Sequence, residues 1–166
     1  EWILFLDADD EFLPGALEYF AKNINKHNDT SFIFAPFYTS RCGNKKLACK
    51  YQEGVVENPY KEHFFGRILP RTGAFVCTRE LCLKEPFDEN IRRFEDLEWL
   101  YRIYKHTIIY KVSKPVLTTN IDFSAASRAR KDIQEDFLGY LDFKGKSFWE
   151  KMALYAFYLG ERNYYP

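Results

Sequence analysis

The sequence lacks several features that mark other classes of protein. Its formal net charge is zero, with 24 basic and 24 acidic side chains, so no overall field attracts nucleic acid. No apolar run approaches the roughly 18 residues that a membrane-spanning helix needs, and we find no signal peptide. The first strand has no lead-in and no initiator Met. We therefore predict a cytoplasmic protein without nucleic-acid partners, and we expect further elements of the fold to precede this chain.

Cysteine is scarce and is not arranged as in zinc sites. The four cysteines, Cys42, Cys49, Cys77 and Cys82, include no C-x-x-C pair, which argues against a structural zinc site. We expect reduced thiols, as in a cytosolic protein, although the sequence leaves room for one disulfide.

Aromatic residues and alternating apolar segments are what the chain does have. Aromatic content is 19%, and a length of 166 residues fits one domain. Apolar runs and helical periodicity follow one another, which indicates the α/β class. We predict strands at 2–6, 32–38, 64–69, 74–77, 107–112 and 116–121, with a weaker one at 47–52. Helices are expected from Pro14 and at 79–84, 95–105, 128–143 and 146–160.

Three carboxylates follow the first strand. Asp7, Asp9 and Asp10 lie within four residues and repel one another, so stability alone does not favour them. Hard divalent cations such as Mn²⁺ or Mg²⁺ prefer oxygen ligands, and ligands bind beyond the carboxyl ends of strands in open α/β sheets. The pattern predicts a metal site. A solvated turn whose acids favour the helix starting at Pro14 is the alternative.

A second acidic pair, Glu95 and Asp96, begins the helix predicted at 95–105. Acids are common at helix starts, so a purely structural role is an open alternative. The flanking rings Phe94 and Trp99 can desolvate a carboxylate, which raises its pKa and makes it a better base.

Together these segments resemble family 2 glycosyltransferases of the GT-A fold. Trp2 to Asp10, followed by Pro14 to Leu17, is similar to the D-x-D region of that family. Pro86 to Glu89, followed by Phe94 to Arg102, is similar to its "FDE … ED-x-(D/E)" segment. The resemblance covers residues 1–125, and we expect 126–166 to form a helical C-terminal extension.

The resemblance implies a GT-A-like mixed sheet flanked by helices that lacks the first nucleotide-binding strands. The resemblance makes Asp9 the direct metal ligand. Asp7 assists by contacting the donor ribose or a metal-bound water, and Asp10 is a weaker candidate for a metal ligand. Asp96 is implied to be the general base, with Glu95 beside it. The implied reaction is an inverting transfer from a nucleotide-sugar, most often a UDP-sugar, to a glycan or lipid-linked acceptor in cell-envelope polysaccharide synthesis.

One departure from the family concerns a His that many relatives carry after the last strand pair. Residues 118–124 contain none, and Asn120 or Asp122 can take its place. We expect His63 to have an ordinary surface role. Arg67 or Arg71 can face a phosphate or the acceptor.

Other functions fit parts of the same pattern. An apolar strand ending in Asp-x-Asp also opens haloacid-dehalogenase-type phosphatases, but Glu11 stands where those carry Thr or Val. A non-catalytic, degenerate transferase-like binding domain is a further alternative. The apolar segment 148–159 is expected to pack on the domain, and it can instead contact a membrane surface at the inner face.

Overall fold

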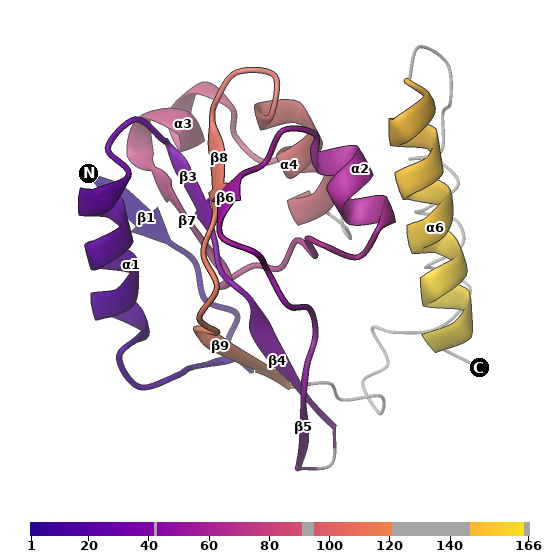
Figure 1. Ribbon diagram of the computed structural model, residues 1–166, viewed down its shortest axis with the longest axis horizontal. Helices are drawn as coiled ribbons and strands as arrows, with labels where there is room; N and C mark the ends of the chain where they lie inside the picture. The colour runs from indigo at the N-terminus through magenta and orange to yellow at the C-terminus, as the bar shows by residue number, and fades with distance from the viewer. Residues whose placement is uncertain (42, 91–94, 121–146, 165–166) are drawn as a thin grey trace.

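A computed structural model of the protein describes residues 1–41, 43–90, 95–120 and 147–164. The described strands are β1 (Trp2–Leu4), β2 (Glu11–Phe12), β3 (Phe32–Phe34), β4 (Phe37–Arg41), β5 (Asn44–Leu47), β6 (Gly54–Val55), β7 (Phe75–Thr78), β8 (Ile109–Lys111) and β9 (Leu117–Asn120). The described helices are α1 (Ala16–Lys26), α2 (Pro59–Phe64), α3 (Arg79–Lys84), α4 (Glu95–Ile103) and α6 (Phe148–Tyr164). Figure 1 shows helices on both sides of the strands.

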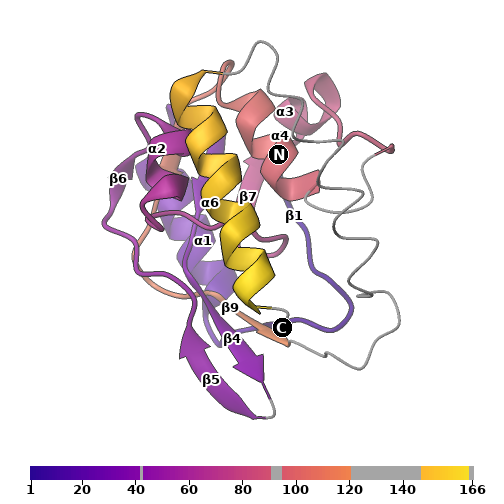
Figure 2. The same ribbon diagram turned by 90° about the vertical axis from the view of Figure 1, so that its right-hand side faces the viewer.

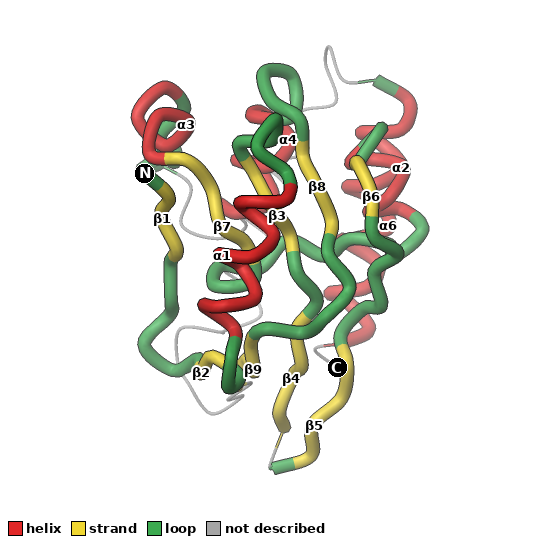
Figure 3. Tube along the Cα trace, turned by 60° about the vertical axis from the view of Figure 1, so that its left-hand side comes forward, coloured by secondary structure: helices red, strands yellow, loops and turns green. Residues whose placement is uncertain are grey.

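The larger sheet has the order β1-β7-β3-β8-β6 and mixes parallel and antiparallel pairs. Its central strand β3 runs parallel to β8 and antiparallel to β7, side by side in Figure 3. Phe32, Ile33 and Phe34 are at most 1% exposed, because a central strand is covered on both faces. β1 is shorter than predicted and only half-buried, since it forms an edge of this sheet. The predicted mixed α/β fold is confirmed.

The smaller sheet has the order β2-β9-β4-β5. β4 runs parallel to β9 and forms a hairpin with β5. We predicted one strand at 32–38, and this is wrong because β3 and β4 belong to different sheets. Pro36 separates them, and its missing N–H cannot continue a ladder.

The helices begin where local capping chemistry favours them. Thr78 accepts the Leu81 N–H at 3.3 Å and caps α3, as the helix predicted at 79–84 requires. α1 begins at Ala16 rather than at Pro14, because Gly15 has a left-handed φ of 76°. Ala16 and Phe20, four residues apart on one face of α1, are buried.

The strand predicted at 64–69 is wrong, because α2 ends at Phe64 and residues 65–69 form a turn and an irregular segment. Pro59 occupies the first turn of α2, and the Asn58 side chain accepts the Lys61 N–H at 2.9 Å. Helix-start chemistry therefore fixes α2 ahead of the apolar run that suggested a strand. The helix predicted at 128–143 lies outside the described residues.

His63 is also placed differently from the prediction. It is only 7% exposed, and its Nδ1 lies 2.6 Å from the hydroxyl of Tyr101 on α4. Burial lowers the pKa of His63 to about 4, so the ring is neutral at pH 7. The surface role that we expected for His63 is wrong, since α2 turns this side chain into the core.

α6 lies against α2, as Figures 1 and 2 show. Trp149 contacts the ring of Phe64, with centroids 6.1 Å apart, and Leu154 is fully buried. The packing expected for segment 148–159 is therefore seen in its described side chains. None of the helices in the described ranges is long and apolar enough to cross a membrane.

Candidate active site

The acid loop, residues 7–10, leaves the end of β1 and turns back toward β2. The Asp10 N–H donates to the Asp7 carbonyl at 3.1 Å, which closes the turn. The three carboxylates differ in exposure: Asp9 is exposed, the Asp7 side chain is 40% exposed and the Asp10 side chain is 0% exposed. Adjacent acids of one motif thus occupy three different environments.

Asp10 is the most heavily hydrogen-bonded of the three. Its carboxylate accepts from the Thr119 hydroxyl and the Asn120 N–H, both at 3.2 Å, at the end of β9. Burial raises the pKa of Asp10, while the charge of Arg71 and these hydrogen bonds act to lower it. Asp10 therefore ties the acid loop to the smaller sheet.

Arg71 is a cation in the middle of the acids. Its Nη2 lies 3.4 Å from Asp10 Oδ2 and 3.6 Å from Asp7 Oδ2. Its buried Nε has no hydrogen-bond partner among the described residues. The sequence suggested Arg71 as a phosphate or acceptor contact but missed its position beside the acid loop. The residues flanking Arg71 carry no signal for a contact 61 positions away.

Asp96 lies at the start of α4 and is half-buried. Burial is the largest cause that raises its pKa, to about 6, and the charge of Glu95 raises it further. The charge of Arg71 and the backbone N–H groups of Leu97 and Thr72 lower it. A carboxyl with a pKa near 6 is mostly ionised at pH 7 yet binds a proton more readily than an ordinary Asp.

The Arg71–Thr72 segment brings the two acidic motifs together. Arg71 contacts Asp7 and Asp10, and the next residue, Thr72, donates its N–H to Asp96. The structure thus assembles Asp7, Asp9, Asp10 and Asp96 at one edge of the fold, although about 85 residues separate the two motifs in sequence. Glu95 adjoins Asp96 and is half-buried.

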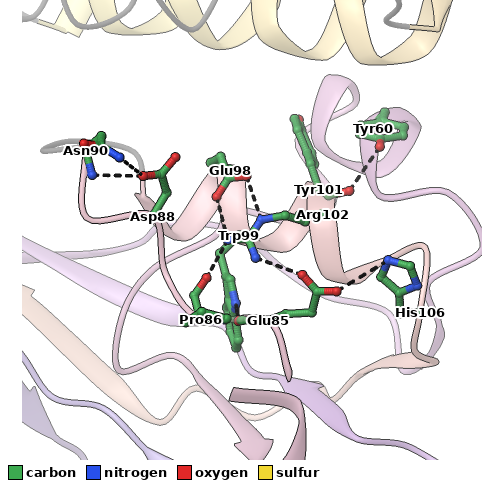
Figure 4. Close-up of polar contacts among 10 residues, drawn as sticks. All are labelled: Tyr60, Glu85, Pro86, Asp88, Asn90, Glu98, Trp99, Tyr101, Arg102 and His106. Atoms are coloured by element: carbon green, nitrogen blue, oxygen red, sulfur yellow. Dashed lines mark hydrogen bonds and ion pairs between the residues drawn. The ribbon is translucent and has the colours of Figure 1, made fainter. Parts of the chain in front are cut away.

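A polar network anchors α4 behind its first turn (Figure 4). Arg102 donates to Glu98 at 2.9 Å and to Glu85 at 3.0 Å, and it also donates to the Pro86 carbonyl at 2.7 Å. The Trp99 indole N–H donates to the Glu85 carbonyl. These contacts join α4 to the loop before it and fix the direction in which the helix starts.

Aromatic rings in edge-on and tilted contact connect the segment between β1 and the acid loop to the same helix. Phe87 lies between Phe5 and Trp99, with centroids at 5.6 and 4.6 Å. Because Phe5 is two residues before Asp7, these rings couple the position of the acid loop to that of α4. Phe94, the other ring expected beside Asp96, lies outside the described residues.

The donor groups of the acid loop suit a hard divalent cation only in part. Asp7 and Asp9 offer accessible carboxylate oxygens, which Mn²⁺ and Mg²⁺ accept together with substrate phosphates and waters. The described residues contain no group of three or more His, Cys, Asp or Glu that can hold a metal ion. Asn120 donates its side-chain N–H to the Asp9 carbonyl at 2.7 Å, and Asp122 lies outside the described residues.

The chain is similar to one known protein family and to solved structures. A family model for glycosyl transferase family 2 matches residues 1–90. A solved structure of S. aureus TarS 1-349 is 15% identical with a TM-score of 0.59 and covers 82% of this chain and 38% of that chain. A second, in complex with UDP-GlcNAc, is 15% identical with a TM-score of 0.63 and covers 99% and 49%. No curated protein matches.

These comparisons give the fold and the family of the chain. The chain spans less than half the length of each TarS chain, and its two mixed sheets flanked by helices form a GT-A-like arrangement, as predicted. The family model matches more than half of the residues, and the chain belongs to glycosyl transferase family 2.

Proposed function

We propose that the chain is the metal- and acceptor-side part of an enzyme that transfers a sugar from a nucleotide-sugar to an acceptor hydroxyl. The observation that carries this proposal is the Arg71–Thr72 segment, which contacts the acid loop with one residue and Asp96 with the next. Family membership and the likeness to a structure in complex with UDP-GlcNAc support a UDP-sugar donor. The acceptor is a glycan or a lipid-linked glycan, and residues 1–125 form the transferase part.

Asp96 acts as the general base in this proposal. The acceptor hydroxyl loses its proton as its oxygen attacks the anomeric carbon, and a half-buried carboxylate with a pKa of about 6 accepts that proton. Attack from the face opposite the departing nucleoside diphosphate inverts the anomeric centre. Glu95 keeps the pKa of Asp96 raised by its negative charge.

Asp9 and Asp7 hold the divalent cation and the donor in this proposal. Asp9 is exposed, and its side chain makes no hydrogen bond or ion pair among the described residues, which leaves its oxygens open to Mn²⁺ or Mg²⁺. The cation supplies charge neutralisation at the departing nucleoside diphosphate. Asp10 is the least suited of the three acids, because both of its oxygens already accept hydrogen bonds.

The exposed side of α6 suits contact with a membrane surface. We place the protein in the cytoplasm, with α6 at its membrane-facing side. Phe148 and Tyr155 of α6 are 68% and 51% exposed, and aromatic side chains partition into membrane interfaces. This contact stays a prediction, tested by co-sedimentation with anionic vesicles.

The function is tested by titration calorimetry of the full-length protein with UDP, with and without Mn²⁺. We expect Mn²⁺ to tighten UDP binding in the wild type and to have no such effect in Asp9→Ala. Asp29→Ala is the matched control, because Asp29 is an exposed aspartate of the loop after α1. Metal-dependent UDP binding that survives Asp9→Ala would show that the acid loop does not hold the metal. No UDP binding at all would favour a non-catalytic domain.

A further inference from the structure

The basic hairpin, defined as β4, β5 and their connection, concentrates positive charge in a chain with no net charge. Residues 30–52 contain four basic side chains and no acidic one. Arg41, Lys45 and Lys46 belong to the hairpin, Lys50 follows it, and all four are exposed. Figures 1 and 2 show the hairpin projecting from the rest of the molecule. Unlike the surfaces where acids and bases alternate, this element presents charge of one sign.

Strand register links the basic hairpin to the acid loop. Lys46 pairs with Thr39, and Thr39 pairs with Thr119 of β9. Directly opposed residues share a face of a sheet, and the Thr119 hydroxyl donates to Asp10. Lys46 and Asp10 thus lie on one face, separated by three strand spacings, or about 14 Å.

The loop that contacts the base covers the same face. A Cβ added at Gly73 lies 3.1 Å from the Leu117 side chain, so this loop rests directly on Leu117. Leu117 is two residues before Thr119 and shares its face. Thr72, which donates to Asp96, is the neighbour of Gly73. Asp96 and Lys46 are therefore reached from the same side of the smaller sheet.

A pocket lies at the root of the basic hairpin. It has a volume of about 190 Å³ and is lined by Ala48, Cys49, Phe64 and Leu69, among others. Ala48 directly follows β5, the strand that carries Lys46. The hairpin thus adjoins a concave surface that can receive part of an extended ligand.

We propose that the acceptor is an anionic saccharide chain that carries carboxylate or phosphate groups. Its reacting hydroxyl lies at Asp96, and a negative group farther along the chain lies at Lys46. Lys45, which donates to the Thr118 hydroxyl at 3.3 Å, and Lys50 add to the positive field around it. This inference rests on the proposed transferase function. The donor diphosphate is a poorer explanation for the hairpin charge, because its place is at the acid loop, three strands from Lys46. Within the described residues, Lys46 has no ion-pair partner that would neutralise it.

The test measures binding of end-labelled hexasaccharides to the full-length protein by fluorescence anisotropy. The probes are a galacturonate hexamer, a phosphorylated hexamer and neutral maltohexaose. We expect at least one anionic probe to bind about tenfold more tightly than the neutral probe, with an advantage that falls as salt rises. The uronate and phosphate arms show which anionic group the hairpin prefers.

The matched variants locate the binding surface. Lys45→Gln/Lys46→Gln should weaken binding of the preferred anionic probe about tenfold, whereas Lys26→Gln/Lys84→Gln should stay within about twofold of the wild type. Lys26 and Lys84 are exposed in the last turns of α1 and α3, away from the hairpin. Neutral and anionic probes that bind equally would overturn the inference. So would equal losses in the two double variants, since binding would then follow net charge alone.

UDP binding, measured on the same samples, separates this inference from the proposed function. If the wild type binds UDP but shows no preference for an anionic probe, only the acceptor inference fails. If the wild type does not bind UDP, the transferase proposal fails whichever probe it prefers.

Discussion

Asp10 and Asp96 are two aspartates that both feel the charge of Arg71, yet their surroundings differ. Asp10 has a fully covered side chain with Arg71 at 3.4 Å and hydrogen bonds from Thr119 and Asn120. Asp96 receives only backbone N–H groups and has Glu95 as its neighbour. Its pKa rises to about 6, because burial outweighs the stabilisation of its charge.

The difference shows how one cation serves two purposes. Where an aspartate has a close cation and several donors, as Asp10 has, these partners offset part of the burial that raises its pKa, and it holds structure together. Where the donors are fewer and a second carboxylate is adjacent, the charge costs free energy and the group is ready to take a proton. We therefore assign structure to Asp10 and chemistry to Asp96.

The largest effect that this comparison predicts is on transfer. Asp96→Asn should lower the rate of sugar transfer about 10²- to 10⁴-fold, because an amide cannot accept the acceptor proton. UDP binding should remain nearly unchanged. In the wild type, transfer should rise with pH through about 6 as Asp96 ionises.

Asp29→Asn is the matched control for transfer. Asp29 is an exposed aspartate of the loop after α1, outside both acidic motifs. Its transfer rate should match that of the wild type. Full activity in Asp96→Asn would show that Asp96 is not the general base. The proposed difference in role between Asp10 and Asp96 would then be lost.

The sequence revealed the parts of this site that are local. Asp7, Asp9 and Asp10 stand together after an apolar run, and Glu95 with Asp96 stands before helical periodicity, so both motifs are readable without a structure. Both lie at the elements where they were expected, the end of β1 and the start of α4. Their roles as metal ligands and base stay predictions.

The sequence could not reveal what depends on contacts between distant segments. Arg71 meets Asp10 across 61 residues, and no periodicity encodes that contact. The division of Asp7, Asp9 and Asp10 into three environments arises from β9, whose Thr119 and Asn120 reach only one of them. The apolar run 64–69 also misled the prediction, because Phe64 ends α2 and packs against Trp149 of α6, while the rest of the run forms a turn and an irregular segment.

The next largest effect concerns stability. Asp10→Asn should lower the free energy of unfolding by about 2 kcal/mol, because hydrogen bonds to a charged group are lost and Arg71 loses a covered partner. Urea unfolding monitored by circular dichroism measures this change. Asp9→Asn is the control and should stay within about 0.5 kcal/mol, since Asp9 is exposed. Equal losses in both variants would contradict the structural role of Asp10.

A smaller change of opposite sign is expected at Asp96. Its folded-state pKa of about 6 exceeds the ordinary value of 3.8, so ionisation destabilises the fold as pH rises between about 4 and 6. Asp96→Asn removes this cost and should raise the free energy of unfolding at pH 8 by about 1–2 kcal/mol. At pH below about 4 the variant and the wild type should have similar stability. Urea unfolding at pH 3.5 and pH 8 tests the sign, and a variant that is less stable at pH 8 would contradict it.

The smallest effect tests whether the α4 anchor acts separately from the environment of Asp96. Glu98→Gln should lower the free energy of unfolding by only about 0.5 kcal/mol, because Arg102 keeps its contacts with Glu85 and Pro86. Glu89→Gln, an exposed acid of the preceding loop, is the control for the lost charge. Because Arg102 is not among the groups that set the pKa of Asp96, the pH midpoint of transfer should stay near 6. If the pH midpoint of transfer moves in Glu98→Gln but not in Glu89→Gln, the Arg102 network changes the pKa of Asp96 through the position of α4. The contrast between Asp10 and Asp96 would then depend on more than their immediate neighbours.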